Sequence, residues 1–392
     1  MKSKLGYGSI IKIPFGPQHP ALEEPENFIF EVDGDIVVKV KPRIGYNHRG
    51  IEKALELRTY IQNLYLVERI CGICSDAHTT CYTQAIEDLL NVEAPPRARY
   101  IRTIIAELER IHSHSLWLGL AAHEIGFDTL FMHIWRDREV VLDLLERISG
   151  NRIHYAMNTI GGVRRDLTAG MTAKIKKGLD FLEERFRYFL KFMEGEETIL
   201  KRTVGVGILK PREAVELCAV GPTLRASGIK NDVRSDDPYA AYDEIPLNVI
   251  VHEGCDVLSR ILVRCGEILE SINIIRYCLD HIPGGMIRVR VPMAVPPGEV
   301  VSRVEAPRGE LIHYAKSNGT TRPERYKVRS PTLGNIPALC KMLLNQHVAD
   351  IPIVLAGIDP CFACMDRMAF KDINRNKQWV WNMEQLKRHT VK

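Results

Sequence analysis

The chain has 392 residues, of which 45% are hydrophobic and 26% are charged, the usual balance of a soluble globular protein. The formal net charge is only +4, and no basic run is interleaved with aromatic residues, so the composition argues against a nucleic-acid partner. No apolar run approaches the ~20 residues of a membrane-spanning helix, and the N-terminal residues contain no signal-peptide-like apolar segment, so we expect an intracellular chain that is soluble by itself and able to dock on membrane subunits.

The elements expected along the chain are mostly helical. Alternating β-branched and polar residues around an Asp-Gly pair predict a β-hairpin over residues 27–46. Apolar residues then recur at helical spacing in five long segments, 50–70, 95–126, 130–153, 173–195 and 255–285. Such lengths favour an elongated helix bundle. Residues 221–246 are rich in Gly, Asp and Pro and predict a long loop, and residues 285–314 predict short strands and turns.

The ten cysteines fall into two groups. Four of them form two C-x-x-C pairs at opposite ends of the chain, Cys71 with Cys74 and Cys361 with Cys364. In a long intracellular chain such thiols are more often metal ligands or catalytic groups than disulfides. The other six stand alone and are interpreted as small buried hydrophobic residues: Cys81, Cys218, Cys255, Cys265, Cys278 and Cys340.

Three interpretations of the two pairs compete. A thioredoxin-type redox couple requires C-x-x-C after a strand in a βαβ context, whereas a predicted helix leads into Cys71 here. A structural zinc site with four cysteines usually has a short gap between the pairs. The third interpretation is a catalytic metal centre built where the first and last parts of the fold meet, with thiolates binding a soft or borderline metal.

Motifs from both ends of the chain resemble the large, catalytic subunit of [NiFe]-hydrogenases. The signature pair is RICGIC with DPCFACMDR. Further motifs follow the family's order along nearly the whole chain: PFGPQHPALEEP, GYNHRGIE, ERIHSH, SGNR, TIGGVRRD and EAPRGELIHY. PFGPQHP, HRG and TIGGVRRD resemble the membrane-associated, energy-converting (Ech-type) branch, whose relatives include the 49 kDa quinone-site subunit of complex I.

The resemblance implies a fold and a domain organisation. It implies a mainly α (α+β) fold, with an elongated helix-bundle core and small β-hairpin or sheet elements at its periphery. It also implies a single domain over residues 1–367, in place of the two or three domains that length alone suggests. The polar, basic extension 368–392 resembles a tail that a dedicated protease removes after metal insertion, with the cut between Arg367 and Met368. An ordinary C-terminal helix is the alternative.

The resemblance also assigns roles to the cysteines. Cys71 and Cys361 would be terminal nickel ligands, and Cys74 and Cys364 would bridge nickel to an iron that carries CO and cyanide. The family splits H2 heterolytically at this centre, and a terminal thiolate serves as the first base.

Proton transfer is assigned to the first motif. Glu24 matches the carboxylate that takes the proton outward, while its neighbour Glu23 is interpreted as a solvated carboxylate. His19 resembles the quinone-facing histidine of the complex I relative, but Ala-Leu-Glu-Glu follows the motif here instead of His-Gly. This departure weakens the quinone interpretation.

Other matched residues surround the expected centre. Arg308 would face the cyanide ligands, with Pro307 shaping its turn and Asp359 beside the same pocket. Glu52 matches a carboxylate that binds magnesium in the family. The histidine that completes that magnesium site is replaced here by Arg367, which cannot bind a cation, so pairing of Glu52 with Arg367 is the alternative.

Two histidines in ERIHSH are expected to be core or supporting residues. His112 and His114 are two residues apart and cannot share a helix face, so at most one points at the centre.

Electrons have to leave through another chain, because no further cysteine set for an iron–sulfur cluster is present. The resemblance implies a small subunit with a [4Fe–4S] cluster, a ferredoxin-type carrier, integral membrane subunits that move H+ or Na+, Ni-insertion proteins and a maturation protease. It places the chain peripherally on the cytoplasmic side of the membrane.

The leading hypothesis is therefore the catalytic subunit of an energy-converting, ferredoxin-linked [NiFe]-hydrogenase. The alternative is a non-hydrogenase coupling subunit of a complex I-like quinone or polysulfide-reducing complex. Such relatives have generally lost cysteines of the two pairs, and all four are present here. A structural zinc protein is a third hypothesis, which metal content distinguishes from the first.

Overall fold

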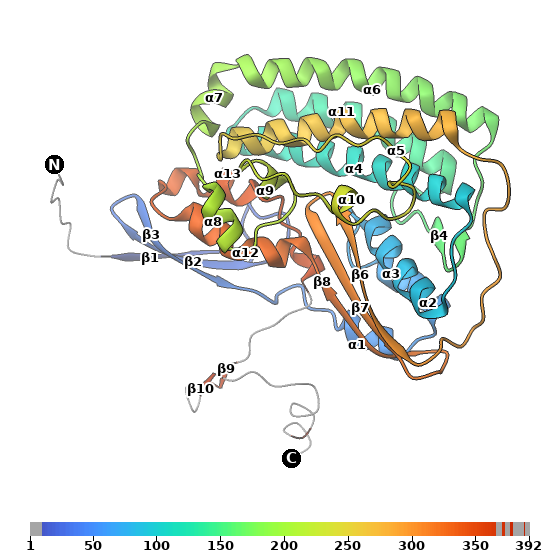
Figure 1. Ribbon diagram of the computed structural model, residues 1–392. Helices are drawn as coiled ribbons and strands as arrows, with labels where there is room; N and C mark the ends of the chain where they lie inside the picture. The colour runs from blue at the N-terminus through green and yellow to red at the C-terminus, as the bar shows by residue number, and fades with distance from the viewer. Residues whose placement is uncertain (1–9, 366–370, 373–376, 379–387, 389–392) are drawn as a thin grey trace.

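The computed structural model describes residues 10–365, together with 371–372, 377–378 and 388 (Figure 1). Its N-terminal part is an antiparallel sheet in the order β1-β2-β3, formed by β1 Ile11–Phe15, β2 Asn27–Asp33 and β3 Ile36–Arg43. The predicted hairpin is confirmed as β2 and β3, which join at Gly34, whose φ of 64° is the left-handed conformation that favours glycine in a tight turn. Phe28 and Phe30 of β2 are fully buried, so one face of this sheet packs on the core.

Four long helices run side by side as the body of the molecule (Figure 1). They confirm four of the predicted helices and are α4 Pro96–Ile125, α5 Asp128–Ser149, α6 Ala169–Gly195 and α11 Val257–His281. The side chains of Thr168 and Asp256 cap the N-termini of α6 and α11, whereas Gly126 and Gly150 end α4 and α5 in the left-handed conformation. Helix α4 lies inside the bundle, since 21 of its 30 residues are buried, whereas only six of the 27 residues of α6 are buried.

The segment leading to the first cysteine pair differs from the prediction. Residues 50–70 form two short helices, α1 Ile51–Glu56 and α2 Tyr60–Glu68, so the prediction of one continuous helix was wrong. The break comes at Thr59, whose side chain accepts a hydrogen bond from Gln62 N while the Gln62 side chain accepts one from Thr59 N. This capping box starts a new helix. Helix α3, Ser75–Leu90, then begins directly after Cys74.

A second antiparallel sheet comes late in the chain and consists of β6 Gly298–Ala306, β7 Gly309–Ser317 and β8 Pro323–Arg329. Strands β6 and β7 pair along their whole length and leave only Pro307 and Arg308 as the turn, so the strands are longer than predicted. Gly309 has φ 126°, and a Cβ there would lie 2.7 Å from the backbone nitrogen of Gly221. A glycine is therefore required where this turn meets the 221–246 segment.

The remaining elements are short connections. The predicted loop 221–246 contains two one-turn helices, α9 Pro222–Arg225 and α10 Val233–Asp236. The others are α7 Glu197–Thr203, α8 Pro211–Glu216, α12 Pro331–Leu343, α13 Ile351–Ala356, the 3-10 turns η1 Val348–Asp350 and η2 Phe362–Cys364, and the strands β4 Asn158–Thr159, β5 Gly162–Val163, β9 Lys371–Asp372 and β10 Lys377–Gln378.

One cluster of contacting buried apolar residues extends from the N-terminal sheet to the C-terminal cysteines. The predicted fold class is confirmed: the protein is mainly α, with small antiparallel sheets beside a helix bundle. Within the described part of the chain, no helix combines the length and apolarity needed to cross a membrane. The predicted domain end at residue 367 lies outside the described residues, and most of the 368–392 extension does too, so both stay predictions.

Candidate metal centre

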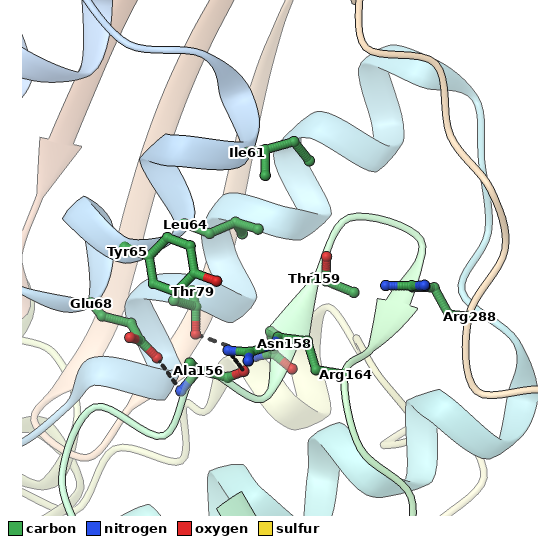
Figure 2. Close-up of a pocket in the computed structure, with 10 residues that line it drawn as sticks. All are labelled: Ile61, Leu64, Tyr65, Glu68, Thr79, Ala156, Asn158, Thr159, Arg164 and Arg288. Atoms are coloured by element: carbon green, nitrogen blue, oxygen red, sulfur yellow. Dashed lines mark hydrogen bonds between the residues drawn. The ribbon is translucent and has the colours of Figure 1, made fainter. Parts of the chain in front are cut away.

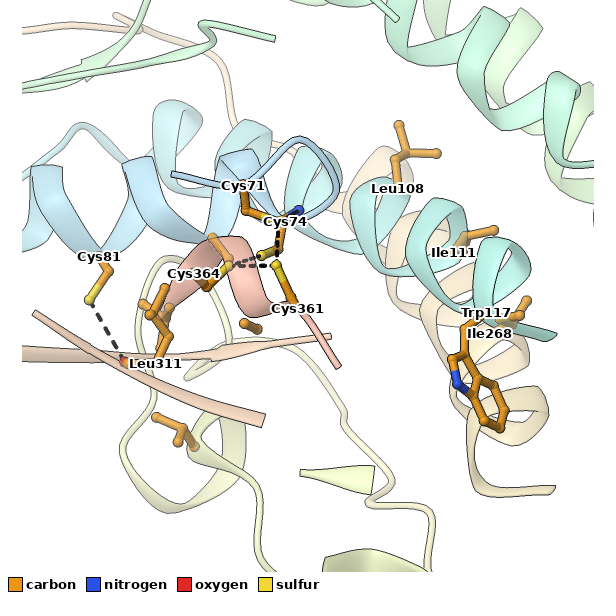
Figure 3. Close-up of a cluster of buried hydrophobic side chains, with 14 of the residues drawn as sticks. Cys71, Cys74, Cys81, Leu108, Ile111, Trp117, Ile268, Leu311, Cys361 and Cys364 are labelled. Atoms are coloured by element: carbon orange, nitrogen blue, oxygen red, sulfur yellow. Dashed lines mark hydrogen bonds between the residues drawn. The ribbon is translucent and has the colours of Figure 1, made fainter. Parts of the chain in front are cut away.

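The fold brings the two cysteine pairs together in its interior (Figure 3). Cys71 lies in the connection between α2 and α3, and Cys74 is the residue before α3. Cys361 directly precedes the 3-10 turn η2, and Cys364 is its last residue. The Sγ–Sγ distances are 3.4 Å from Cys71 to Cys361, 3.9 Å from Cys74 to Cys364 and 2.9 Å from Cys361 to Cys364. All four side chains are buried. The first and last parts of the chain thus build one thiol cluster.

The four thiols are electrostatically unequal. The pKa of Cys71 is lowered well below its usual value, because its sulfur accepts hydrogen bonds from Cys361, Cys364 and Cys74. The backbone N–H groups of Ile73 and Cys74 also donate to this sulfur, both at 3.3 Å. The pKa of Cys364 is raised well above its usual value, because its thiol interacts with those of Cys361, Cys71 and Cys74. The cluster thus favours one thiolate at Cys71, while the other protons have to be displaced when a cation binds.

The donor set fits a thiolate-bound metal centre. The sulfur atoms of Cys71, Cys361 and Cys364 lie within 4.8 Å of one another, and so do those of Cys74 and Cys364 with a ring nitrogen of His78. Buried sulfur donors at this spacing suit soft or borderline metals. His78 was not identified from the sequence. It follows Cys74 by four residues, one turn along α3, and this spacing indicates that the two side chains lie on the same side of the helix.

The second pair is held by residues far away in the sequence. The peptide of Ala363, between Cys361 and Cys364, donates its N–H to Glu24 Oε2 at 2.6 Å. Its carbonyl accepts from Arg49 Nη2 at 2.9 Å. Burial raises the pKa of Glu24, and the backbone hydrogen bond to Ala363 opposes that rise. The structure therefore places Glu24 directly against the second pair.

Arg308 and Asp359 lie together beside the thiols. Arg308, in the β6–β7 turn after the buried Pro307, donates from Nη2 to Asp359 Oδ1 at 2.6 Å and from Nε to the Asp359 carbonyl at 2.7 Å. A weaker bond from Nη1 reaches Ser113 Oγ at 3.4 Å. Burial disfavours the charge on Arg308, but Asp359 and nearby cysteines outweigh this effect and hold its pKa well above the usual value. Among the described residues, Asp359 Oδ2 has no hydrogen-bond partner.

Glu52 lines a small cavity together with Arg49 and Cys364, and its carboxylate is engaged by β8. Its carboxylate accepts from Lys327 Nζ at 2.8 Å and from Val328 N at 3.0 Å, which ties α1 to β8. A cation at Glu52 would have to displace the Lys327 ammonium group. The alternative partner Arg367 lies outside the described residues, so the magnesium site and that pairing both stay predictions.

Glu23 is exposed, as expected for a solvated carboxylate. Its dense surroundings, followed by the charge of Asp359, nevertheless raise its pKa to about 8. Glu23 thus lies within the electrostatic field of the centre, which the sequence interpretation did not anticipate.

The histidines of ERIHSH are both buried in α4. His114 Nε2 lies 2.8 Å from Glu267 Oε2, inside a buried ionic network that also contains Arg225. Burial, followed by the charges of Arg138 and Arg308, lowers the pKa of His112 well below its usual value. Neither histidine joins the thiol cluster.

The six single cysteines divide by location. Cys81, Cys265 and Cys278 are fully buried, as predicted. Cys218 is exposed, and Cys255 and Cys340 are half-buried, so the prediction was wrong for Cys218 and only partly right for the other two. Each of these three lies just outside a helix or in its last turn, where periodicity gives little information.

A cavity of about 180 Å³ lies next to α2 and is a different site (Figure 2). Its walls come from α2, α3 and the 156–164 segment, including Glu68, Thr79, Asn158 and Arg164. None of the four paired cysteines lines it, so this cavity does not form the candidate centre.

Comparisons with known proteins identify the family of the chain. A family described as the 49 Kd subunit of respiratory-chain NADH dehydrogenase matches residues 124–294 and 287–367, and one described as nickel-dependent hydrogenase matches residues 49–122. The two families together cover both the bundle and the first cysteine pair.

Individual relatives cover nearly the whole chain. The membrane-bound hydrogenase subunit alpha of Pyrococcus furiosus is 41% identical over 92% of this chain and 88% of its own length. The carbon monoxide-induced hydrogenase of Rhodospirillum rubrum is 42% identical over 92% of this chain and 100% of its own length. Among solved structures, a chain of the membrane-bound sulfane sulfur reductase, an archaeal respiratory membrane complex, superposes with a TM-score of 0.87 at 32% identity, covering 91% of this chain and 98% of that one.

Proposed function

This chain belongs to the family that unites the large subunits of nickel-dependent hydrogenases with the 49 kDa subunit of respiratory NADH dehydrogenase, and from that premise we propose that it is the catalytic subunit of an energy-converting [NiFe]-hydrogenase. The observation that carries the proposal is the meeting of four buried cysteines from the two ends of the chain. A dithiol redox couple uses two cysteines, whereas four sulfur donors in one buried cluster are typical of a metal site.

The cysteines would hold the metals. Cys71, Cys74, Cys361 and Cys364 would together hold the nickel and the iron through their sulfur atoms. When bound, the Ni–Fe centre with its CO and cyanide ligands supplies the redox chemistry that separates H2 into two protons and two electrons. Cys71 is the thiol most readily present as a thiolate, because hydrogen bonds to its sulfur lower its pKa, so it would be the first of the four to offer a charged ligand.

Glu24 would move the proton away from the thiolates. Its Oε2 is fixed by the Ala363 N–H, so this bond holds the carboxylate beside the second pair. Its raised pKa makes the protonated state more accessible than for a solvated glutamate. One group that is both fixed and easily protonated is what a first proton carrier requires.

Arg308 and Asp359 would set the electrostatics of the pocket. Arg308 keeps its charge in a buried position because Asp359 binds it through both the carboxylate and the carbonyl. Such a fixed cation suits anionic cyanide ligands. Pro307 would shape the turn that presents it. The sequence-matched Glu52 would then serve mainly to fix α1 against β8.

Electrons would pass to partner chains. Among the described residues, the other cysteines do not form a second set suited to an iron–sulfur cluster. We therefore assign electron transfer to a small subunit with a [4Fe–4S] cluster and a ferredoxin-type carrier, in a complex with ion-translocating membrane subunits at the cytoplasmic face of the membrane. Residues 1–367 would act as one domain, and a protease would remove residues 368–392 once Ni-insertion proteins have loaded the metal.

A second candidate function is a coupling subunit of a complex that reduces sulfur compounds or quinone. The solved sulfane sulfur reductase chain favours it, because the two chains share 32% identity over nearly their whole lengths. The presence of all four cysteines favours the hydrogenase.

Isotope exchange separates the two candidates. The anaerobically purified complex is incubated with D2 in H2O without any electron carrier, and HD is followed by mass spectrometry. A hydrogenase forms HD, and a Cys364→Ser complex does not. A fully assembled, metal-loaded complex without exchange would favour the coupling subunit.

A further inference from the structure

We propose that Arg49 is a positioning residue that clamps the two cysteine pairs together through three backbone carbonyl groups. Its guanidinium donates from Nη1 to the Arg69 carbonyl at 2.8 Å and from Nη2 to the Ile70 carbonyl at 2.7 Å. The same Nη2 donates to the Ala363 carbonyl at 2.9 Å. One side chain thus joins the two residues just before Cys71 to Ala363, one of the two residues between Cys361 and Cys364.

The first two carbonyls belong to the end of α2. Arg69 is the C-terminal cap of α2, and Ile70 follows it directly before Cys71. Carbonyls at a helix C-terminus lack helical partners and carry the negative end of the helix dipole, so a cation there is favourable. Arg49 satisfies both groups and fixes the direction in which the chain enters the first cysteine pair.

The third carbonyl belongs to a peptide that is held on both sides. Glu24 accepts the Ala363 N–H at 2.6 Å, and Arg49 donates to the carbonyl of the same residue. The Cys361 N–H additionally donates to Thr332 Oγ1 at 3.0 Å. The second pair is therefore positioned by bonds to its backbone, which leaves its sulfur atoms available to a metal.

Arg49 itself has a fixed base. Gly50 follows it with φ 66° and turns the chain into α1. Helix α1 is anchored to β8 because Glu52 accepts hydrogen bonds from Lys327 and Val328. From this fixed position the planar guanidinium can donate to several carbonyls at once through different N–H groups. A lysine ammonium is a compact donor that cannot reproduce this arrangement.

Arg49 is exposed and is not part of the apolar core, so we expect its loss to affect metal binding more than overall stability. The clamp rests on the proposed function only in requiring the four cysteines to hold a metal. Without the clamp, only the rest of the fold connects the two pairs. More of the free energy of metal binding is then used to order the four cysteines, so the measured affinity falls.

The test is a Co2+ titration of the full-length, metal-free chain, followed by thiolate-to-cobalt absorption. We expect R49K and R49Q to weaken Co2+ binding roughly tenfold or more, since each loses hydrogen bonds from a charged donor. Arg58 is the matched control: it is exposed in the same region and, among the described residues, donates only to the Ala54 carbonyl, at 3.2 Å. R58K should bind Co2+ as the wild type does, and thermal unfolding of all variants should be nearly unchanged.

Three results would overturn the proposal. R49K and R49Q could bind Co2+ with wild-type affinity, which excludes a clamp. They could lose binding only in step with a large loss of thermal stability, which makes Arg49 a determinant of the fold. If the wild-type chain itself does not bind Co2+, both the metal site and the role of Arg49 are rejected. If the wild type binds and the variants are unaffected, only the role of Arg49 is rejected.

Discussion

Arg308 and Asp359 form a fully buried ion pair, with Nη2 and Oδ1 2.6 Å apart, that joins the β6–β7 turn to the segment just before Cys361. Arg308 also donates to the Asp359 carbonyl. The ion pair therefore fixes the backbone just before the second cysteine pair and also the position of the Arg308 charge. Asp359 adopts φ 54°, a conformation that is costly for a residue other than glycine and that these bonds hold in place.

Removing Asp359 should strongly destabilise the protein. In D359A the Arg308 cation stays buried without its partner, and we expect a loss of about 3–5 kcal/mol in the free energy of unfolding. Arg303 and Asp237 form an exposed pair at 2.7 Å, and D237A should cost less than about 1 kcal/mol. Urea unfolding of both variants measures the difference. Equal losses would show that the buried pair has no special structural role.

Replacing Glu24 should slow proton transfer without releasing the metal. In E24Q the amide oxygen can still accept from Ala363 N, but the side chain no longer carries a proton, so we expect H2 oxidation and evolution to fall at least ~100-fold with nickel content unchanged. The assays are H2 uptake and nickel analysis of the purified complex.

Glu23 is the control for Glu24. Its side chain is exposed, and its raised pKa brings it closer to the neutral state that glutamine mimics. E23Q should retain most activity at pH 7. Full activity of E24Q, or an equally large loss in E23Q, would contradict the assignment of the proton carrier.

Glu26 should make stability depend on pH. It is 1% exposed, and burial raises its pKa from 4.5 to about 7 in the folded chain. The folded state therefore binds a proton more tightly than the unfolded state, so this contribution is fully present below pH 4.5 and is lost as pH rises to about 7.

E26Q tests this dependence, because glutamine is neutral throughout. Relative to the wild type, E26Q should gain stability between pH 5 and pH 8, by at most about 3 kcal/mol. Urea unfolding at several pH values gives the comparison. A constant difference between the two proteins over this range would contradict it.

The mature subunit should end at Arg367. Residues 368–392 are predicted to be cut off after metal insertion, so intact-mass measurement of the subunit from the active complex should give a chain without them. The unprocessed chain should accumulate when cells lack nickel. An active, nickel-containing subunit that retains residues beyond Arg367 would show that this branch escapes cleavage.

Much of the fold could be predicted from local patterns. The β2–β3 hairpin and the long helices have clear periodicity and marked ends, such as Gly126 after α4. The break between α1 and α2 was missed although Thr59 and Gln62 show the spacing of a capping box. Apolar periodicity continued across that break, and it outweighed the local signal.

The candidate site could be predicted only in part. Family motifs pointed to the cysteines, and motif matching selected Glu24 and Arg308. The carbonyl contacts of Arg49 and the Lys327 partner of Glu52 link segments that are distant in sequence. Backbone acceptors leave no trace in residue identity, so such contacts require the three-dimensional structure.

The most direct test of the central claim is an infrared spectrum of the anaerobically purified native complex, in the window where metal-bound CO and cyanide absorb. We predict bands of both ligands, which disappear in a Cys364→Ser complex and persist in a Cys278→Ala complex, since Cys278 is a fully buried core residue. A processed, fully assembled complex that contains no nickel and shows no such bands would contradict the assignment of this chain as a [NiFe]-hydrogenase catalytic subunit.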